Sequence, residues 1–506
     1  RSACEFWLKP GENETMYFQP AFNGALTLVK TNESAEIKLQ NLTLLITNSE
    51  STLEAAQIDE ALTLLNDRSI SGSTRFVACK TILARYASSP EYLDQITNPQ
   101  IRCYQGLIDL CTDEQVDAGI RYDAAIECLE VCEDAGLRRN VFDALLKLAA
   151  PADHRVSTID WNEEGVYMPW IIEAQAAKVV VEHSSDPEQI KASYRKMLAI
   201  AREDDLTIEE DVVVNSENRK NWPAIKQGRI HEARANIAEY VVENCDDSNI
   251  LKEAYETCVI LIREDDLDSR SKLKVGEAVL QHSTTNYPSL FKEDVMRAMV
   301  EFCDKRSEKP RNAEGVSHEF LDRWKAGRLV AENTKDPEIQ SDAFQSLANL
   351  AMDLPSDPNW LFSYKNLNLL PVSVIENAKN KAAIDTAYQA QLQWSVNTDI
   401  NPYHRNTARD MLELNYDQMD EGMKYEVCII FINYCNNGDG SEIHERRRKA
   451  SFVLSHTDDK LLQASARQAL EGLMSEQGIS ETDYEGSQEA INKSLGVRKP
   501  FEYSIE

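Results

Sequence analysis

Two short acidic runs are the residues whose type and spacing most directly suggest chemistry. Each run follows an arginine at the end of an apolar helical segment, and the six acids are Glu203, Asp204, Asp205, Glu264, Asp265 and Asp266. Acids at a helix C-terminus oppose the helix dipole by about 0.3–1 kcal/mol each, so two equivalent runs invite a functional explanation. In a stacked array they would form a ladder that receives Lys or Arg side chains or a divalent ion. Alternatively, Asp205, Thr207 and Asp266 cap the helices that follow.

Three tryptophans form the second group of candidate binding residues. Trp161, Trp222 and Trp360 lie in segments that interrupt the helical pattern. Inserted loops of repeat proteins often carry recognition, and tryptophan is favoured at the centre of protein interfaces. The other interpretation is that each indole packs over the core between neighbouring units, because large aromatic side chains are usually well buried.

Catalytic motifs were sought and none is predicted. The sequence has no G-x-G-x-x-G, no G-K-S/T and no G-x-S-x-G, and neither His231-Glu232 nor His318-Glu319 is followed by the second histidine of a zincin helix. We therefore predict no catalytic residue, no metal site and no cofactor. The alternative is an α/α-toroid helical enzyme that acts on a glycan through two loop carboxylates, drawn from Asp160, Glu163, Glu164, Glu209, Glu210 and Asp211.

Self-similarity decides the architecture that must position these residues. The segments 179–206 and 240–267 align without a gap at an offset of 61 residues, from VVVEHSSDPEQ to REDDL in the first copy. A third copy, LVAENTKDPEIQSDAFQSLANLAMD, runs from Leu329 to Asp353. Repeats of this kind indicate a solenoid, in which only a neighbouring unit covers the apolar face of each unit.

Each copy is predicted to be two antiparallel helices joined by a short turn. His183, Asn244, Asn333 and His456 stand where the first helix ends, and we expect the left-handed conformation there. A Ser, Thr or Asp follows as the N-cap of the second helix, with proline in its first turn in two copies.

At this point the pattern resembles the HEAT-like family of α-solenoid repeats. The residues that carry the resemblance are D-P-E-Q-I-K-A-S-Y from Asp186 and D-P-E-I-Q-S-D-A-F from Asp336, over about residues 52–478. The resemblance implies superhelical stacking of helix pairs and binding of partners, and it implies no catalysis. Uneven repeat lengths depart from a regular array.

The predicted fold is all-α: a right-handed α-solenoid of stacked antiparallel helix pairs with a small β-rich N-terminal segment. Residues 1–50 are expected to form that β-rich cap, because apolar and polar residues alternate around Tyr17–Phe22 and from Ile37 to Leu45. The repeats occupy 51–478, and a C-terminal helix and tail occupy 479–506.

Charge bears on the choice of partner. With a formal net charge of −31 the chain repels phosphate backbones, so nucleic acid is not an expected partner, whereas a protein with a basic surface is. The favoured function is a non-enzymatic scaffold or adaptor that binds such a protein, or further copies of itself. The basic run Arg446–Lys449 is read as the solvated face of a helix, and the alternatives are a nuclear signal or an anion-binding patch.

Compartment and membrane association follow from weaker signals. No apolar run approaches the roughly 20 residues of a spanning helix, so no membrane span is expected. Eleven scattered cysteines favour reduced, buried thiols, which makes a cytoplasmic location the preferred expectation, although a targeting signal removed from the chain would leave no trace here.

Overall fold

The computed structural model describes most of the chain. The described residues are 24–27, 29–30, 34–48, 55–88, 98–149, 156–157, 170–203, 222–282, 289–304, 313–352, 369–398, 400, 402–437, 443–476 and 478–496. The chain divides into two compact units, unit 1 at Arg1–Leu261 and unit 2 at Ile262–Glu506. Each unit is treated by itself below.

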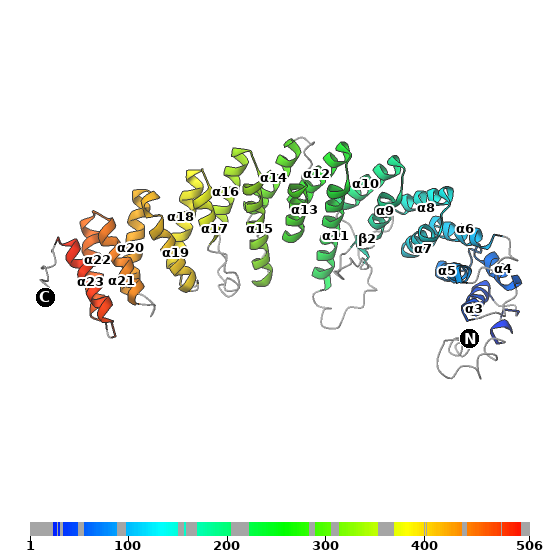
Figure 1. Ribbon diagram of the computed structural model, residues 1–506, viewed down its shortest axis with the longest axis horizontal. Coiled ribbons are helices and arrows are strands. Elements are labelled where there is room, and N and C mark those ends of the chain that lie inside the picture. The colour runs from blue at the N-terminus through cyan, green and yellow to red at the C-terminus, as the bar shows by residue number, and fades with distance from the viewer. Residues whose placement is uncertain are drawn as a thin grey trace, which may run out of the picture. The chain divides into compact units, whose positions relative to one another are not determined.

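Unit 1 is built from helices that pack against their neighbours in sequence and against the next helix but one (Figure 1). Its helices are α3 (Ala35–Asn48), α4 (Ala55–Leu64), α5 (Gly72–Ser88), α6 (Pro99–Thr112), α7 (Ala118–Val131), α8 (Ala135–Leu148), α9 (Ile172–His183), α10 (Pro187–Arg202), α11 (Trp222–Asn244) and α12 (Ser248–Arg263), whose last two residues belong to unit 2.

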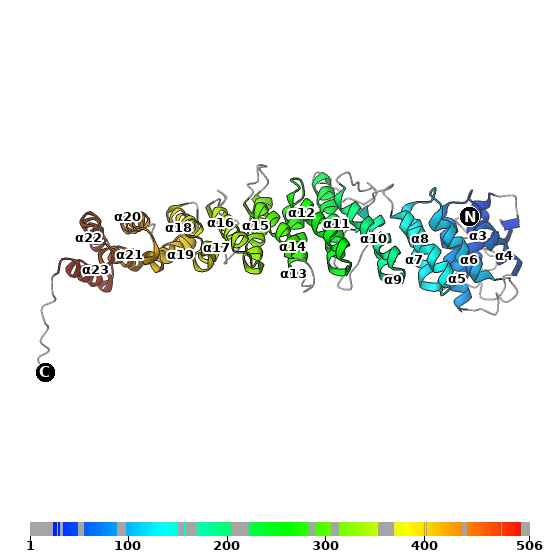
Figure 2. The ribbon, with the colours of Figure 1, turned by 90° about the horizontal axis from the view of Figure 1, so that it is seen from above.

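Unit 2 repeats the same two-layer arrangement. Its elements are α13 (Ser269–Gln281), α14 (Ser289–Asp304), α15 (Ala313–Asn333), α16 (Pro337–Met352), α17 (Leu369–Asn377), α18 (Lys381–Val396), α19 (Pro402–Leu414), the 3-10 helix η4 (Tyr416–Gln418), α20 (Glu421–Asn437), α21 (Ile443–His456), α22 (Lys460–Met474) and α23 (Glu481–Ser494). Figure 2 shows α18, α20 and α22 in one layer and α19, α21 and α23 in the other. These stacked helix pairs have the form of a HEAT-like repeat fold.

Helix boundaries follow the sequence repeat residue by residue. Helix α9 ends at His183 and α11 at Asn244, while α10 and α12 begin and end at positions that differ by the same 61 residues. Asp186 caps α10 by accepting from Glu188 N at 3.0 Å, and Pro187 takes the first helical position. Asp336 caps α16 in the same way at 2.8 Å. The predicted turn between the helices of a pair is confirmed.

The predicted left-handed residue at the end of each first helix is wrong. Among the described residues other than glycine, only Asn98 has a positive φ. The side chains of Asn244 and Asn333 instead donate to the carbonyls four residues earlier, Tyr240 O at 2.9 Å and Leu329 O at 2.8 Å. Because the amide satisfies a carbonyl at the helix end, the backbone has no need of a left-handed cap.

Buried arginines join successive helix pairs. Each lies on the first helix of a pair and donates to a carbonyl in the last turn of the preceding helix, where the helix dipole is negative. The donors and acceptors are Arg234 to Ala201 O at 2.9 Å, Arg323 to Cys303 O at 2.9 Å, Arg409 to Ser395 O at 2.6 Å and Arg446 to Cys435 O at 2.9 Å. All four side chains belong to residues at most 7% exposed, so each is a buried charge that is hydrogen-bonded.

The described residues of the N-terminal segment form helix in place of the predicted β-rich cap. The stretch from Ile37 to Leu45 lies inside α3, with Leu39, Leu42 and Ile46 on its buried stripe. These spacings of three and four residues are helical, and Thr43 Oγ1 bonds to Leu39 O at 2.8 Å within the helix. The other predicted strand, Tyr17–Phe22, lies outside the described residues. A two-residue antiparallel pair, β1 (Val156–Ser157) with β2 (Trp170–Ile171), lies elsewhere in unit 1.

Candidate functional site

The turns inside successive helix pairs of unit 1 share one edge, which we call the turn edge. Three turns follow one another there, between α7 and α8, α9 and α10, and α11 and α12. Each carries three acids that are exposed or half-buried: Glu130, Glu133 and Asp134; Glu182, Asp186 and Glu188; Glu243, Asp246 and Asp247. The turn edge is therefore a repeated acidic surface.

Contacts between neighbouring pairs hold the turn edge together. Tyr194 Oη donates to Asn244 O at 2.7 Å, and Tyr240 Oη donates to Glu182 Oε1 at 3.3 Å. Lys191 Nζ lies 3.2 Å from Asp247 Oδ2. Hydrogen bonds from the first backbone amides of α12, above all from Ile250, together with Lys191, hold the pKa of the Asp247 carboxyl below its usual value. These contacts thus hold Glu182 and Asp247 in place, and the Asp247 carboxyl is charged at neutral pH.

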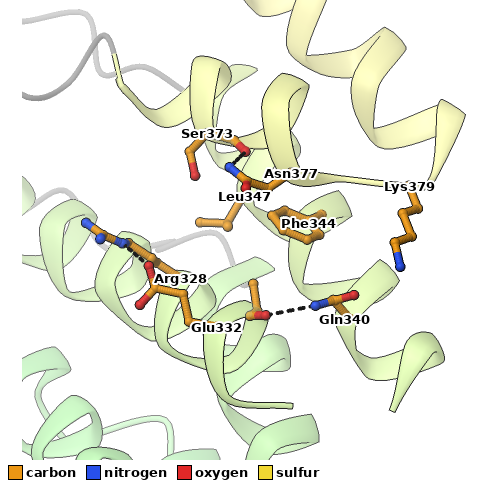
Figure 3. Close-up of a pocket in the computed structure, with 9 residues that line it drawn as sticks. Arg328, Glu332, Gln340, Phe344, Leu347, Ser373, Asn377 and Lys379 are labelled. Atoms are coloured by element: carbon orange, nitrogen blue, oxygen red, sulfur yellow. Dashed lines mark hydrogen bonds and ion pairs between the residues drawn. The ribbon is translucent and has the colours of Figure 1, made fainter. Parts of the chain in front are cut away.

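A cleft of about 280 Å³ opens at the corresponding turns of unit 2 (Figure 3). Its walls come from the ends of α15 and α17, and Phe344 and Leu347 of α16 lie at its floor. On the α15 wall, the Arg328 guanidinium pairs with Glu332 at 2.6 Å, one helical turn away. Gln340 Nε2 donates to Ala331 O at 3.1 Å, and Asn377 Nδ2 donates to Ser373 O at 2.9 Å.

The side chains of this cleft suit contacts with another molecule. Among the described residues that line it there is no histidine, no cysteine and no pair of carboxylates, and Ser373, the one hydroxyl among them, has no base beside it. The volume lies just below the roughly 300–1,000 Å³ of ordinary small-molecule pockets. An apolar floor with amide and charged groups around its rim suits a side chain of another protein.

A second cleft, of about 610 Å³, lies at the turn edge of unit 1. The residues that line it come from the end of α5, the start of α6 and the end of α7, and they are Lys80, Thr81, Leu83, Ala84, Tyr86, Ala87, Gln100, Tyr104, Glu127 and Val131. Tyr104 is 5% exposed and Val131 is 37% exposed. This cleft is adjacent to the first acidic turn, because Val131 stands between Glu130 and Glu133 in the chain.

The two acidic runs that the sequence singled out are only partly described. Glu203 is the residue after α10 in unit 1, and Glu264, Asp265 and Asp266 follow α12 in unit 2. Asp204 and Asp205 lie outside the described residues, so the ladder stays a prediction. The helix after the second run is capped by Asp268, which accepts from Ser271 N at 3.0 Å, and the predicted cap Asp266 is wrong by two residues.

The three tryptophans stay untested. Trp161 and Trp360 lie outside the described residues, and Trp222 is known only as the first residue of α11. The loop acids of the enzyme alternative, from Asp160 to Asp211, lie outside the described residues as well.

The basic run Arg446–Lys449 is not a solvated helix face, because Arg446 is 5% and Lys449 is 1% exposed. Lys449 Nζ pairs with Asp410 at 2.5 Å and with Glu413 at 2.7 Å. Arg446 pairs with Glu476 at 2.5 Å.

The two other cations of the run are engaged as well. Arg447 lies 3.2 Å from Asp483, and Arg448 pairs with Glu413 at 3.2 Å and with Glu445 at 2.9 Å. The run joins α21 to the helices around it, which leaves little of its charge for an anion or a receptor.

The described residues show no cluster of metal ligands and no membrane-spanning helix. No three His, Cys, Asp or Glu side chains among them gather as a metal ion would require. In the same part of the chain, none of the helices combines the length and apolarity needed to cross a bilayer.

Sequence reasoning missed the turn edge and the buried arginines. The turn acids are visible as E-x-x-x-D and E-x-x-D-D spacings in aligned copies, where the sequence predicts a role only for a Ser, Thr or Asp as N-cap. The arginines were visible as lone basic residues within apolar helical stripes, such as Arg234 and Arg323. Acceptors 20 or 33 residues earlier in the chain cannot be assigned without the packing of the helices.

Comparisons with known proteins give no family for this chain. No protein-family model matches the chain, and no curated protein matches it. Among solved structures, a chain in the Pds5–Scc1 complex matches at 10% identity and TM-score 0.27, covering 98% of this chain and 70% of that one. The UNC-45 chaperone, described as binding and folding muscle myosin, matches at 12% identity and TM-score 0.23, covering 96% of this chain and 72% of that one. A structure of Kap95p bound to RanGDP matches at 12% identity and TM-score 0.21, covering 98% of this chain and 62% of that one.

With TM-scores this low, the assignment to HEAT-like repeats rests on the helix pairs of the chain itself, with their shared caps and boundaries.

Proposed function

We propose that this protein is a non-enzymatic scaffold that binds a basic protein partner through its acidic repeat surface. The observation that carries the proposal is the turn edge of unit 1, where three successive turns each present three acids. A repeat array supplies an extended binding surface because equivalent residues of successive units lie side by side.

Charge supports a basic partner. Three cations compensate the turn edge in part. Lys191 lies 3.2 Å from Asp247, and the other contacts are longer: Arg139 lies 3.8 Å from Asp186, Lys178 lies 3.8 Å from Glu182, and Lys191 lies 3.9 Å from Glu188. Such exposed pairs contribute roughly 0–1 kcal/mol, so a partner's Lys or Arg can displace them at little cost. The chain's net charge of −31 also steers a cationic protein toward it.

The first experiment is affinity capture of the intact protein from its native lysate at low and at raised salt, followed by mass spectrometry. The expected result is a reproducible basic protein whose recovery falls as salt rises, because salt screens exposed charge pairs. Recovery of no reproducible partner at either salt would contradict the proposal.

A matched pair of variants ties that partner to the turn edge. The first combines Glu133→Gln, Glu188→Gln and Glu243→Gln, one acid from each turn, and avoids the caps at Asp134 and Asp186. The second variant is the control and removes the same number of charges outside these turns.

The control combines Glu60→Gln, Glu114→Gln and Glu256→Gln. We expect capture to fall at least about tenfold with the turn-edge variant and to change little with the control, since each lost contact ion pair costs up to about 1 kcal/mol. Equal losses with both variants would show that net charge alone holds the partner.

We also propose the finer features that the sequence suggests: right-handed stacking of the helix pairs, a cytoplasmic location and self-association as a second mode of binding. The high like charge of two copies opposes self-association at low salt. Sedimentation velocity at low and at high salt tests self-association. If copies associate, the fraction of dimer is expected to rise with the salt concentration.

A further inference from the structure

The cleft of unit 1 has the size of a binding pocket and an apolar character. Leu83, Ala84, Ala87 and Val131 supply its aliphatic wall, and the ring of Tyr104 is buried beside them. Its volume of about 610 Å³ leaves room for an apolar side chain together with part of the backbone that carries it.

The polar side chains around the cleft already have partners within the chain. Lys80 Nζ lies 2.8 Å from Glu127 Oε2, and Thr81 Oγ1 donates to Val77 O at 2.9 Å. Tyr104 Oη donates to Val131 O at 2.7 Å. A polar small molecule would have to break these bonds to be held in place, whereas an apolar side chain buries surface without disturbing them.

Exposed acids are the chain neighbours of Val131, which lines the cleft. Glu130 and Glu133 are exposed on either side of Val131, and Asp134 is exposed at the cap of α8. Among the described residues that line the cleft, the only cation is Lys80, which is paired with Glu127. An occupant with basic residues beside its apolar anchor would therefore gain favourable charge contacts at the rim.

We propose that this cleft docks a linear segment of the partner in which an apolar side chain is flanked by lysines or arginines. The apolar side chain enters between α5 and α7 over Tyr104, and the flanking cations face the acids of the first turn. The inference rests on the proposed function and deepens it, because it names the partner's recognition element at the turn edge.

The test uses fluorescence anisotropy with two short labelled peptides on the full chain. One has a central leucine with two lysines on each side, and the other has serine in place of the leucine. Burying a leucine side chain corresponds to roughly a tenfold gain in affinity or more, so the leucine peptide is expected to bind that much more tightly.

Two variants separate the cleft from the rim. Ala84→Phe places a ring in the cleft and should abolish the leucine preference while leaving the serine peptide unchanged. Its control is Ala464→Phe, at an exposed alanine of α22 outside the cleft, which should leave the preference intact. The double substitution Glu130→Gln with Glu133→Gln should weaken both peptides and keep the preference. If Ala84→Phe disturbs the circular dichroism spectrum, Ala87→Phe replaces it.

Equal binding of the two peptides, or a leucine preference that survives Ala84→Phe, would overturn the proposal. A peptide with glutamates in place of the lysines that bound equally well would overturn the charge argument. The peptide results can fail while lysate capture still recovers a basic partner, and capture of that partner can still be lost with the turn-edge variant. In that case the proposed function would stand, and the cleft would not be its recognition element.

Discussion

The ion pairs of Lys449 lend themselves to a quantitative test. This residue is 1% exposed, and its ammonium contacts Asp410 at 2.5 Å and Glu413 at 2.7 Å on α19. Its neighbour Arg448 pairs with the same two acids but has a side chain 38% exposed. Two adjacent cations thus share their partners and differ in burial, which makes Arg448 a built-in control.

The expected magnitude follows from burial. Removing one member of a buried ion pair costs about 3–5 kcal/mol, because it leaves a charge uncompensated. Asp410 is 50% and Glu413 is 20% exposed, so water recovers part of that loss and the expected cost of Lys449→Met is about 2–3 kcal/mol. Methionine retains the aliphatic stem of the lysine, so little packing is lost. For Arg448→Met we expect at most about 1 kcal/mol, as for exposed pairs.

Hydrogen exchange with mass spectrometry on the full chain measures both costs locally. Peptides that cover α19 and α21 should exchange about 30- to 150-fold faster in Lys449→Met, since each 1.4 kcal/mol is a factor of ten. In Arg448→Met the increase should stay below about sixfold. If the two variants accelerate exchange equally, burial does not strengthen the Lys449 pairs, and the reasoning fails.

Two further outcomes follow from packing. A Cβ at Gly327 of α15 would lie 2.7 Å from Cys303 Sγ, so Gly327→Ala should lower the free energy of unfolding by about 1–3 kcal/mol in urea titrations. Gly472 has no atom within 4 Å of the position that a Cβ would take, so Gly472→Ala should raise the free energy of unfolding by about 0.5–1 kcal/mol. An unchanged stability of Gly327→Ala would contradict the close packing at this glycine. All ten described cysteines are buried, and burial raises the pKa of the Cys258 thiol to about 12. A thiol reagent at pH 8 should therefore label none of these ten rapidly in the native chain, and rapid labelling of any of them would contradict their burial.

The repeat and its turns could be predicted because their causes are local. Asp186 and Pro187 cap and start a helix through contacts within a few residues, and the structure confirms both. The strand predicted over Ile37–Leu45 failed because that stretch satisfies a period of two and a helical period together. Packing of Leu39 and Leu42 into the core decided for the helix.

The candidate site was less accessible from sequence for a different reason. Acids such as Glu182 and Asp247 occupy aligned positions of the repeat in the sequence, but a shared edge exists only once the helix pairs stack. The clefts are likewise made by three helices at once, as Tyr104 and Val131 on successive helices illustrate.

By itself, the sequence determined the helical class, the 61-residue repeat and the capped turns, since these depend on periodicity and on hydrogen bonds between near neighbours. The tertiary structure alone decided which charged side chains are buried and which partners they pair with. Lys449 and Arg446 read as surface residues until Asp410 and Glu476, 39 and 30 positions away, are brought against them. A buried charge is tolerated only where packing supplies its partner, and that partner is not encoded in the neighbouring sequence.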